Sequence, residues 1–254
     1  MDLNLNGKKA LVTGASKGIG LGIAKRLVLE GCHVLLVARN EDDLKNAQNN
    51  LSELNQNVTV DFKAMDLSIT AEVESLAREN IDLDILVNNA GAIPAGNIDR
   101  VDEDTWRAAW DLKLFGYISL CRGIYANMSK RQEESGQRVI LNIIGAGGER
   151  PSAGYIAGAG ANAGLMAITR AMGGVSRKHG IRVLGINPGQ IVTERLETMQ
   201  RVLATEKFGD SERWKEMWDT RYPPGNVEHI ADASAFLVSD LSSNTTGTIV
   251  TIDG

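Results

Sequence analysis

Seven short apolar segments recur along the chain, separated by longer stretches with the mixed polarity of helices. They are apolar at nearly every position, which is typical of strands buried on both faces of a parallel sheet. The intervals are long enough for the crossover connections that parallel strands require. The pattern therefore predicts a doubly wound α/β (Rossmann) fold with helices on both faces of a mostly parallel sheet. The predicted strands are Ala10–Thr13, Val34–Ala38, Val58–Phe62, Ile85–Asn88, Val139–Ile144, Val183–Asn187 and Ile249–Ile252.

One segment, at about 190–224, is long, polar and aromatic where a regular unit would have a short loop. In a chain of 254 residues with 43% hydrophobic content, we expect a single domain, 1–254, with this segment as a substrate lid. Its large side chains favour an apolar or aromatic small-molecule substrate, or else they pack the lid onto the body. They are Met199, Phe208, Trp214, Met217, Trp218 and Tyr222.

Composition narrows the class of protein. A formal charge of -5 argues against a nucleic-acid partner, because a surface that follows phosphates carries a basic excess. The two cysteines, Cys32 and Cys121, lack metal-ligand spacing, and the N-terminus lacks the apolar run of a signal peptide. Apolar runs stay below the roughly 18 residues needed to span a bilayer. We therefore expect a cytoplasmic protein with no membrane partner and no metal.

A glycine-rich turn, Thr13-Gly14-Ala15-Ser16-Lys17-Gly18-Ile19-Gly20, follows the first predicted strand and opens a helix that runs to about Glu30. Glycines permit a tight turn and let a pyrophosphate approach the backbone, while the helix N-terminus favours negative charge. Glycines also mark ordinary turns, but the strand before and the helix after this one predict a dinucleotide site.

The end of the second predicted strand bears on the choice of nucleotide. A site that prefers NAD usually offers a carboxylate to the adenosine ribose there, whereas this chain has Ala38-Arg39-Asn40. Arg39 and Lys17 match the charge of a 2'-phosphate, which favours NADP(H) over NAD(H). The alternative is that both are solvated surface charges.

Further motifs make the chain resemble the short-chain dehydrogenase/reductase family along nearly its whole length. These are Asp66-Leu67, Asn88-Asn89-Ala90-Gly91, Asn187-Pro188-Gly189 with Thr193, and Thr246-Gly247 through Asp253-Gly254. The resemblance implies a seven-stranded sheet, a nicotinamide cofactor and a homodimer or homotetramer. Taken together, the candidate cofactor-binding residues are Gly14, Ser16, Lys17, Gly18, Ile19, Gly20, Arg39, Asp66, Leu67, Asn88, Ala90, Gly91, Lys113, Tyr155, Pro188, Gly189, Ile191 and Thr193.

The catalytic pattern of that family is only partly present. In the family a tyrosine exchanges a proton with the substrate oxygen, a lysine four residues later lowers the tyrosine pKa, a serine orients the substrate, and an asparagine completes a water relay. Tyr155 matches the tyrosine, but Ala159 occupies the lysine position. Gly145 is favoured as the equivalent of the serine, although Asn142 has the usual spacing of thirteen residues before Tyr155.

Lys113 aligns with the family's asparagine. Since the family fold brings that helix beside the tyrosine helix, we expect Lys113 to point towards the space left at Ala159, depress the Tyr155 pKa and bind the ribose. The competing interpretation is a surface or structural lysine in a protein that has lost this site. Asn162 lies near the same helix face as Tyr155. Its amide either replaces some of the polar catalytic side chains that the chain lacks or bridges packed helices.

The leading hypothesis is an NADP(H)-dependent oxidoreductase that transfers hydride between nicotinamide and a carbonyl or alcohol, with Tyr155 as acid/base and Lys113 as its electrostatic partner. The alternative is an NADP(H)-binding protein with a sensor or structural role, motivated by Gly145 and Ala159.

Overall fold

A computed structural model describes residues 2–131, 136–218, 221 and 223–253. Seven strands form one sheet in the order β3-β2-β1-β4-β5-β6-β7, and every pair of neighbours is parallel. This confirms the predicted doubly wound fold. The strands are β1 (Lys9–Thr13), β2 (His33–Ala38), β3 (Val60–Ala64), β4 (Ile85–Asn88), β5 (Arg138–Ile143), β6 (Ile181–Pro188) and β7 (Ile249–Ile252).

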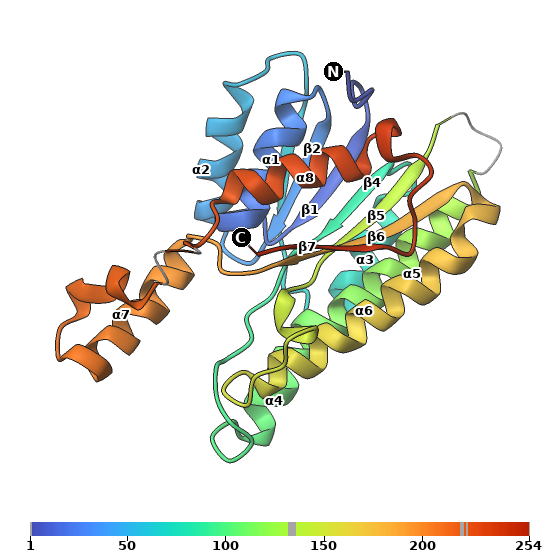
Figure 1. The fold of residues 1–254 in the computed structure, drawn as a ribbon. Helices are drawn as coiled ribbons and strands as arrows, with labels where there is room; N and C mark the ends of the chain where they lie inside the picture. Colours follow the sequence, from blue (N-terminus) through green and yellow to red (C-terminus); the bar gives the residue numbers. More distant parts are fainter. Residues whose placement is uncertain (1, 132–135, 219–220, 222, 254) are drawn as a thin grey trace.

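Helices cover both faces of the sheet (Figure 1). One face carries α1 (Gly18–Leu29), α2 (Glu41–Ser52) and α8 (Val227–Val238), and the other carries α3 (Thr70–Glu79), α5 (Gly116–Ser129) and α6 (Ile156–Ser176). A short helix, α4 (Glu103–Trp110), continues through a π-helical turn, η1 (Asp111–Phe115), into α5. The 3₁₀ turns are η2 (Ala146–Gly148), η3 (Arg177–His179), η4 (Ser211–Met217) and η5 (Asp240–Ser242).

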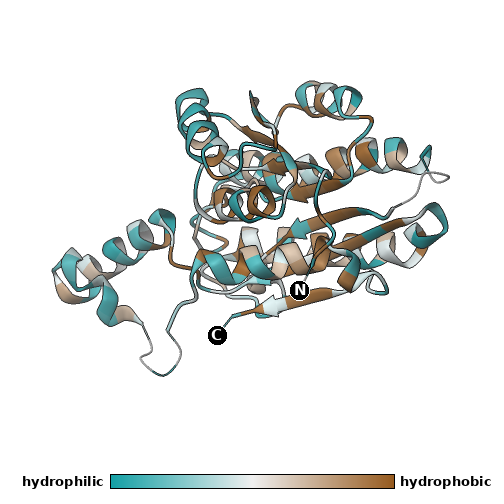
Figure 2. Ribbon diagram, turned by 90° about the horizontal axis from the view of Figure 1, so that it is seen from above, coloured by the Kyte–Doolittle hydropathy of each residue, from teal (hydrophilic) through white to brown (hydrophobic). Residues whose placement is uncertain are grey.

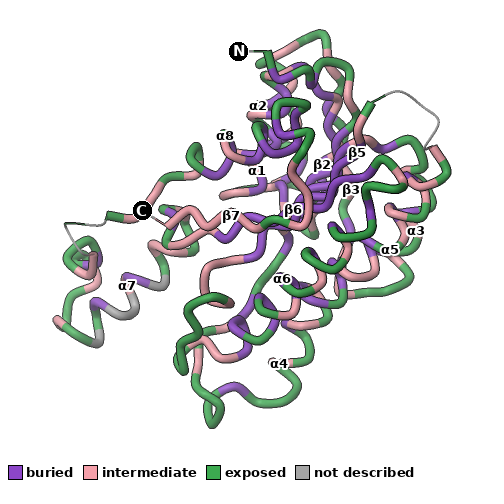
Figure 3. The backbone as a smooth tube through the Cα atoms, turned by 45° about the vertical axis from the view of Figure 1, so that its right-hand side comes forward, coloured by how far each residue is buried: buried purple, intermediate pink, exposed green. Residues whose placement is uncertain are grey.

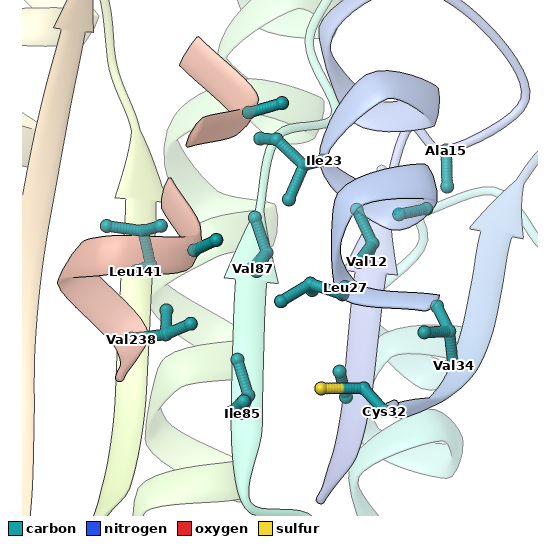
Figure 4. Packing of buried hydrophobic residues seen from close by; sticks show 14 of the residues in the cluster. Val12, Ala15, Ile23, Leu27, Cys32, Val34, Ile85, Val87, Leu141 and Val238 are labelled. Carbon is teal, nitrogen blue, oxygen red and sulfur yellow. The ribbon is translucent and has the colours of Figure 1, made fainter. Parts of the chain in front are cut away.

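The core lies between the sheet and its helices. Ile23 and Leu27 of α1 point towards sheet residues such as Val12 and Val87 (Figure 4). Val238 of α8 lies near Leu141 of β5 in the same cluster. The strands are largely hydrophobic in Figure 2, and Figure 3 shows buried strands between helices whose outer sides are exposed. Burial of apolar surface on both faces of each central strand explains why those strands show no polar alternation.

The predicted strands match the observed ones closely except at β3, expected at Val58–Phe62 and found at Val60–Ala64. Parallel pairing with β2 begins at Val34 with Val60 and continues to Ala38 with Ala64. Because β3 is an edge strand, it accommodates the polar Lys63, which apolar patterning does not recognise as strand.

The segment expected to interrupt the alternation contains α7 (Glu194–Phe208) and η4, which pack against each other and project from the body (Figure 1). Trp214 is buried there. The ring centroids of Trp214 and Trp218 are 5.0 Å apart, and the Arg201 guanidinium carbon lies 5.6 Å from the centroid of the Trp214 ring. No helix in the described part of the chain is long and apolar enough to cross a membrane.

Candidate cofactor and active site

Most of the predicted site motifs follow the carboxyl ends of strands, so the parallel sheet brings them to one edge. The exceptions are Thr246-Gly247, which precedes β7, and Lys113, which lies on η1. β1 and β4 are neighbours in the sheet. The helix that follows β1 packs on one face of the sheet, and α5, which follows β4, packs on the other face. Ligands of doubly wound folds bind at such a reversal of strand order.

The glycine turn after β1 depends on the absence of side chains. Gly14 and Gly18 have φ angles of +63° and +57°, in the left-handed region. A Cβ at Gly20 would lie only 2.2 Å from the Gly14 carbonyl oxygen, so α1 and the turn approach too closely for any other residue. At the start of α1, Lys17 provides no side-chain cap, which leaves backbone N–H groups for an anion.

The turn is held to the end of β4. The backbone N–H groups of Asn89 and Ala90 donate to Thr13 Oγ1 at 2.9 and 3.0 Å, and Asn89 Nδ2 donates to the Gly14 carbonyl at 3.1 Å. These bonds fix the phosphate turn relative to the next strand of the site. The glycines and the uncapped helix start fit the pyrophosphate of a dinucleotide.

The expected adenosine end lies beyond β2 and β3. Arg39 and Lys17 are exposed, and Lys17 Nζ lies 3.8 Å from Glu194 Oε2 at the start of α7. The backbone N–H of Ser68 donates to Asp66 Oδ1 at 3.0 Å. This hydrogen bond holds the pKa of Asp66 below its usual value, and the positive charge of Arg39 lowers that pKa further. The two cations are therefore open to an anionic group, while Asp66 is a fixed carboxylate.

Asn88 and Asn142 face the core instead of the edge of the sheet. Asn88 Nδ2 donates to Asn142 Oδ1 at 2.9 Å, and Asn142 Nδ2 donates to Thr169 Oγ1 at 2.9 Å. The Asn88 amide is thus directed into the core and not towards the predicted cofactor surface. Asn142 is likewise engaged within the core, whereas Gly145 lies beyond the end of β5.

Lys113 is buried at the strand ends, with 8% of its surface exposed. Its Nζ donates to the Ile143 carbonyl at 2.8 Å and to Tyr117 Oη at 3.1 Å. Its stem lies against Gly91, where a Cβ would come within 2.7 Å of Lys113 Cδ. Burial, with a smaller contribution from the positive charge of Arg195, lowers the pKa of Lys113 to about 7. Lys113 is therefore neither solvated nor a permanent cation.

Tyr155 immediately precedes α6, and its ring lies on the first turn of that helix. A Cβ at Gly158 would lie 2.1 Å from both Cε1 and Cζ of the ring, so glycine is required for this ring position. Burial raises the pKa of Tyr155, and the charge of Arg195 opposes that rise. Ala159 is buried and contributes only its backbone N–H, which donates to the Tyr155 carbonyl at 2.9 Å.

The segment after β6 lies beside the phosphate turn. The Gly189 N–H donates to the Ile252 carbonyl at 2.9 Å, Pro188 ends β6, and Ile191 is buried. Thr193 caps α7, and its Cγ2 lies 3.6 Å from the position a Cβ would take at Gly18. The structure therefore brings this motif and the glycine turn together.

Two candidate functional residues, Arg195 and Tyr117, were not predicted from the sequence. Arg195 donates to the carbonyls of Gly91 and Ile93 at 3.2 and 2.5 Å, which links the start of α7 to the segment that follows β4. Tyr117 bonds Lys113 from the next helical turn, a contact that spacing by four residues could have suggested. No pattern in the sequence marks Arg195.

Among the aromatic residues of the projecting segment, Trp214 packs within the segment itself. Tyr222 and the side chain of Met199 lie outside the described part of the chain. The roles of this group in substrate binding stay predictions.

Comparison with known proteins gives similarities that extend along the chain. A family described as short chain dehydrogenase matches residues 8–203. The 3-oxoacyl-(acyl-carrier-protein) reductase of Chlamydia muridarum is 32% identical, covering 100% of this chain and 99% of its own, and gluconate 5-dehydrogenase of Gluconobacter oxydans is 29% identical, covering 99% and 95%. The crystal structure of L-sorbose reductase from Gluconobacter frateurii, complexed with NADPH and L-sorbose, has a TM-score of 0.90 and 29% identity, covering 100% and 98%.

Proposed function

Because the chain belongs to the short-chain dehydrogenase/reductase family, we propose that it is an NADP(H)-dependent oxidoreductase that transfers hydride between nicotinamide and a carbonyl or alcohol. The relatives named above are reductases and a dehydrogenase whose names refer to different substrates, which supports the reaction class and leaves the substrate itself open. A small molecule bound under the segment 190–224 is the partner we propose.

NADP(H) is the cofactor that the charges of the site favour. Arg39 and Lys17 are exposed near the proposed ribose position, where a guanidinium and an ammonium group would bind a 2'-phosphate. The L-sorbose reductase was solved with NADPH, which supports the same choice. When bound, the nicotinamide ring donates or accepts the hydride.

Tyr155 holds the proton that the substrate oxygen receives during reduction. Burial alone raises its pKa, so phenolate character needs nearby positive charge. Arg195 supplies part of that charge, and we assign the rest to Lys113, which at a pKa of about 7 exists in both protonation states near neutral pH. An anionic dinucleotide favours the charged state of Lys113, and this couples cofactor binding to activation of Tyr155.

The observation that carries this proposal is the burial of Lys113 between Gly91 and the Ile143 carbonyl, at the edge where the cofactor motifs meet. Burying a lysine is costly, so a functional reason for it is expected. One feature favours the second candidate, an NADP(H)-binding protein without catalysis: the phenol that Lys113 contacts is that of Tyr117 instead of Tyr155.

The deciding experiment separates binding from turnover. We expect NADPH to bind, with quenching of protein fluorescence, and to be oxidised in the presence of one or more members of a carbonyl panel. Tyr155→Phe should keep NADPH binding and lose turnover, whereas Tyr125→Phe on α5 should keep both. Binding without oxidation by any carbonyl would favour the non-catalytic candidate.

Cofactor preference has its own test. Arg39→Ala should weaken NADPH binding at least tenfold while changing NADH binding little, and Arg122→Ala, an exposed arginine on α5, should affect neither. Equal loss for both nucleotides would contradict the assignment of Arg39 to the 2'-phosphate.

We also propose that the chain forms a homodimer or homotetramer in the cytoplasm. Phe115 is 52% exposed and lines a cavity of about 420 Å³ with Trp106 and Trp110, an apolar surface suited to association. The thiols of Cys32 and Cys121 are free and buried, which fits a reducing compartment. Light scattering during size-exclusion chromatography would reveal a monomer if the association proposal is wrong.

A further inference from the structure

Asn162 on α6 is a buried polar side chain without a full set of hydrogen-bond partners. Only 2% of the residue is exposed, and within the described part of the chain no group donates to its Oδ1 and no acceptor is hydrogen-bonded to its Nδ2. The Nδ2 donors are therefore free to bond an oxygen of a ligand. Buried amides are normally hydrogen-bonded, because an unpaired polar atom loses its water and gains nothing in return. An amide at this position of a helix that is otherwise rich in alanine and glycine therefore needs a reason.

The amide occupies the space beside Gly145. A Cβ at Gly145 would lie 2.9 Å from Asn162 Nδ2, so the amide fills the place that a side chain of residue 145 would take. Gly145 also has a φ of +135°, which side-chain-bearing residues rarely adopt. The local chain is thus built to admit a polar group from α6 instead of one from the end of β5.

Asn162 and Tyr155 share one wall of the site. A Cβ at Gly147 would lie 3.3 Å from Tyr155 Cδ1 and 3.8 Å from Asn162 Nδ2, which places the ring and the amide side by side over η2. The η2 turn itself lies directly on α6, since a Cβ at Gly148 would come within 2.8 Å of the Ala163 nitrogen. Two rigid elements therefore hold the amide and the phenol in a fixed relationship.

We propose that the Asn162 amide binds the substrate oxygen together with Tyr155 and orients it for hydride transfer, a role that rests on the proposed function. In reduction, the carbonyl carbon accepts hydride from the nicotinamide and the oxygen accepts a proton from Tyr155. The amide N–H donates a hydrogen bond to that oxygen throughout and transfers no proton. Asn162 is thus a catalytic residue supplied by the helix, where the family pattern would have a serine on the strand end.

The test replaces the amide without changing its volume greatly. Asn162→Leu should reduce kcat/KM for carbonyl reduction about ten- to a hundredfold, leave the NADPH dissociation constant unchanged, and leave the protein at least as resistant to urea. The enantiomer ratio of the alcohol formed from a prochiral ketone should move towards equality, because orientation is lost. Asn127→Leu, which removes a half-buried amide on α5, should leave turnover and the enantiomer ratio as in the wild type.

The outcomes are distinguishable. Wild-type protein that oxidises no NADPH with any carbonyl would overturn the proposed function and this role with it. If the wild type turns over but Asn162→Leu has the same enantiomer ratio and the same kcat/KM, the role of Asn162 alone is overturned. The same holds if the variant loses urea resistance and cofactor binding together while turnover per bound cofactor is kept, since the amide would then be structural.

Discussion

Replacing Lys113 by methionine should stabilise the cofactor-free protein and lower its activity. The pKa of Lys113 is about 7 in the folded chain and 10.5 for the free side chain. At about 1.4 kcal/mol per pKa unit, holding this lysine in the fold costs about 5 kcal/mol at pH 6. Methionine keeps an unbranched apolar stem against Gly91 and has no charge to desolvate.

Lost hydrogen bonds offset part of that gain. Lys113 donates two bonds, and each contributes about 1 kcal/mol net. The Ile143 carbonyl keeps Tyr117 as a donor at 3.1 Å, so it is not left unpaired. We therefore expect Lys113→Met to be more stable than the wild type by about 3 kcal/mol at pH 6.

The pH dependence identifies the cause. Between the two pKa values the unfolded chain binds more protons than the folded one, so wild-type stability rises with pH, and the cost of Lys113 disappears above the unfolded pKa. The advantage of Lys113→Met should therefore shrink by about 3 kcal/mol between pH 6 and pH 9.5.

Urea unfolding of both proteins at several pH values measures this difference directly, because their other ionisable groups are the same. Lys25→Met on the exposed side of α1 controls for the loss of a positive charge as such. An advantage that stays constant with pH, or a variant less stable at every pH, would refute the reasoning. At saturating NADPH, turnover of Lys113→Met should fall on the order of a hundredfold. NADPH binding should weaken as well, because the dinucleotide and the charged state of Lys113 favour each other.

Other substitutions probe the rest of the site. Gly158→Ala should lower kcat at least tenfold without changing NADPH affinity, because the new Cβ would lie 2.1 Å from the Tyr155 ring; Gly174→Ala, where nothing lies within 4 Å, is its control, and retained kcat would contradict the ring position. Gly20→Ala should raise the NADPH dissociation constant more than tenfold, since its Cβ would lie 2.2 Å from a carbonyl oxygen of the turn; unchanged affinity in a titration would show that the turn does not bind the cofactor. Arg195→Gln removes a charge that lowers the Tyr155 pKa, so the acid/base pKa in the pH profile of kcat/KM should move upwards; a profile that does not move would separate Arg195 from Tyr155.

The sequence by itself determined the sheet and the place of the site. Strands buried on both faces are apolar throughout, so six of them could be recognised closely, and β3 was misplaced because an edge strand tolerates Lys63. The glycine turn could be recognised because its requirement is local: Gly14 and Gly18 need left-handed backbone whatever surrounds them. Parallel pairing then guaranteed that motifs after different strands would meet at one edge.

Only the tertiary structure decided which polar groups face one another there. Lys113 was predicted near Tyr155, yet its nitrogen bonds Tyr117 and the Ile143 carbonyl, and Asn88 turns its amide into the core. The contacts of Arg195 with Gly91 and of Asn162 with Gly145 join segments far apart in the chain. Such contacts depend on helix packing and on side-chain rotamers, which are set by neighbours from other elements, so a local sequence pattern specifies the edge of the sheet but not the hydrogen bonds made along it.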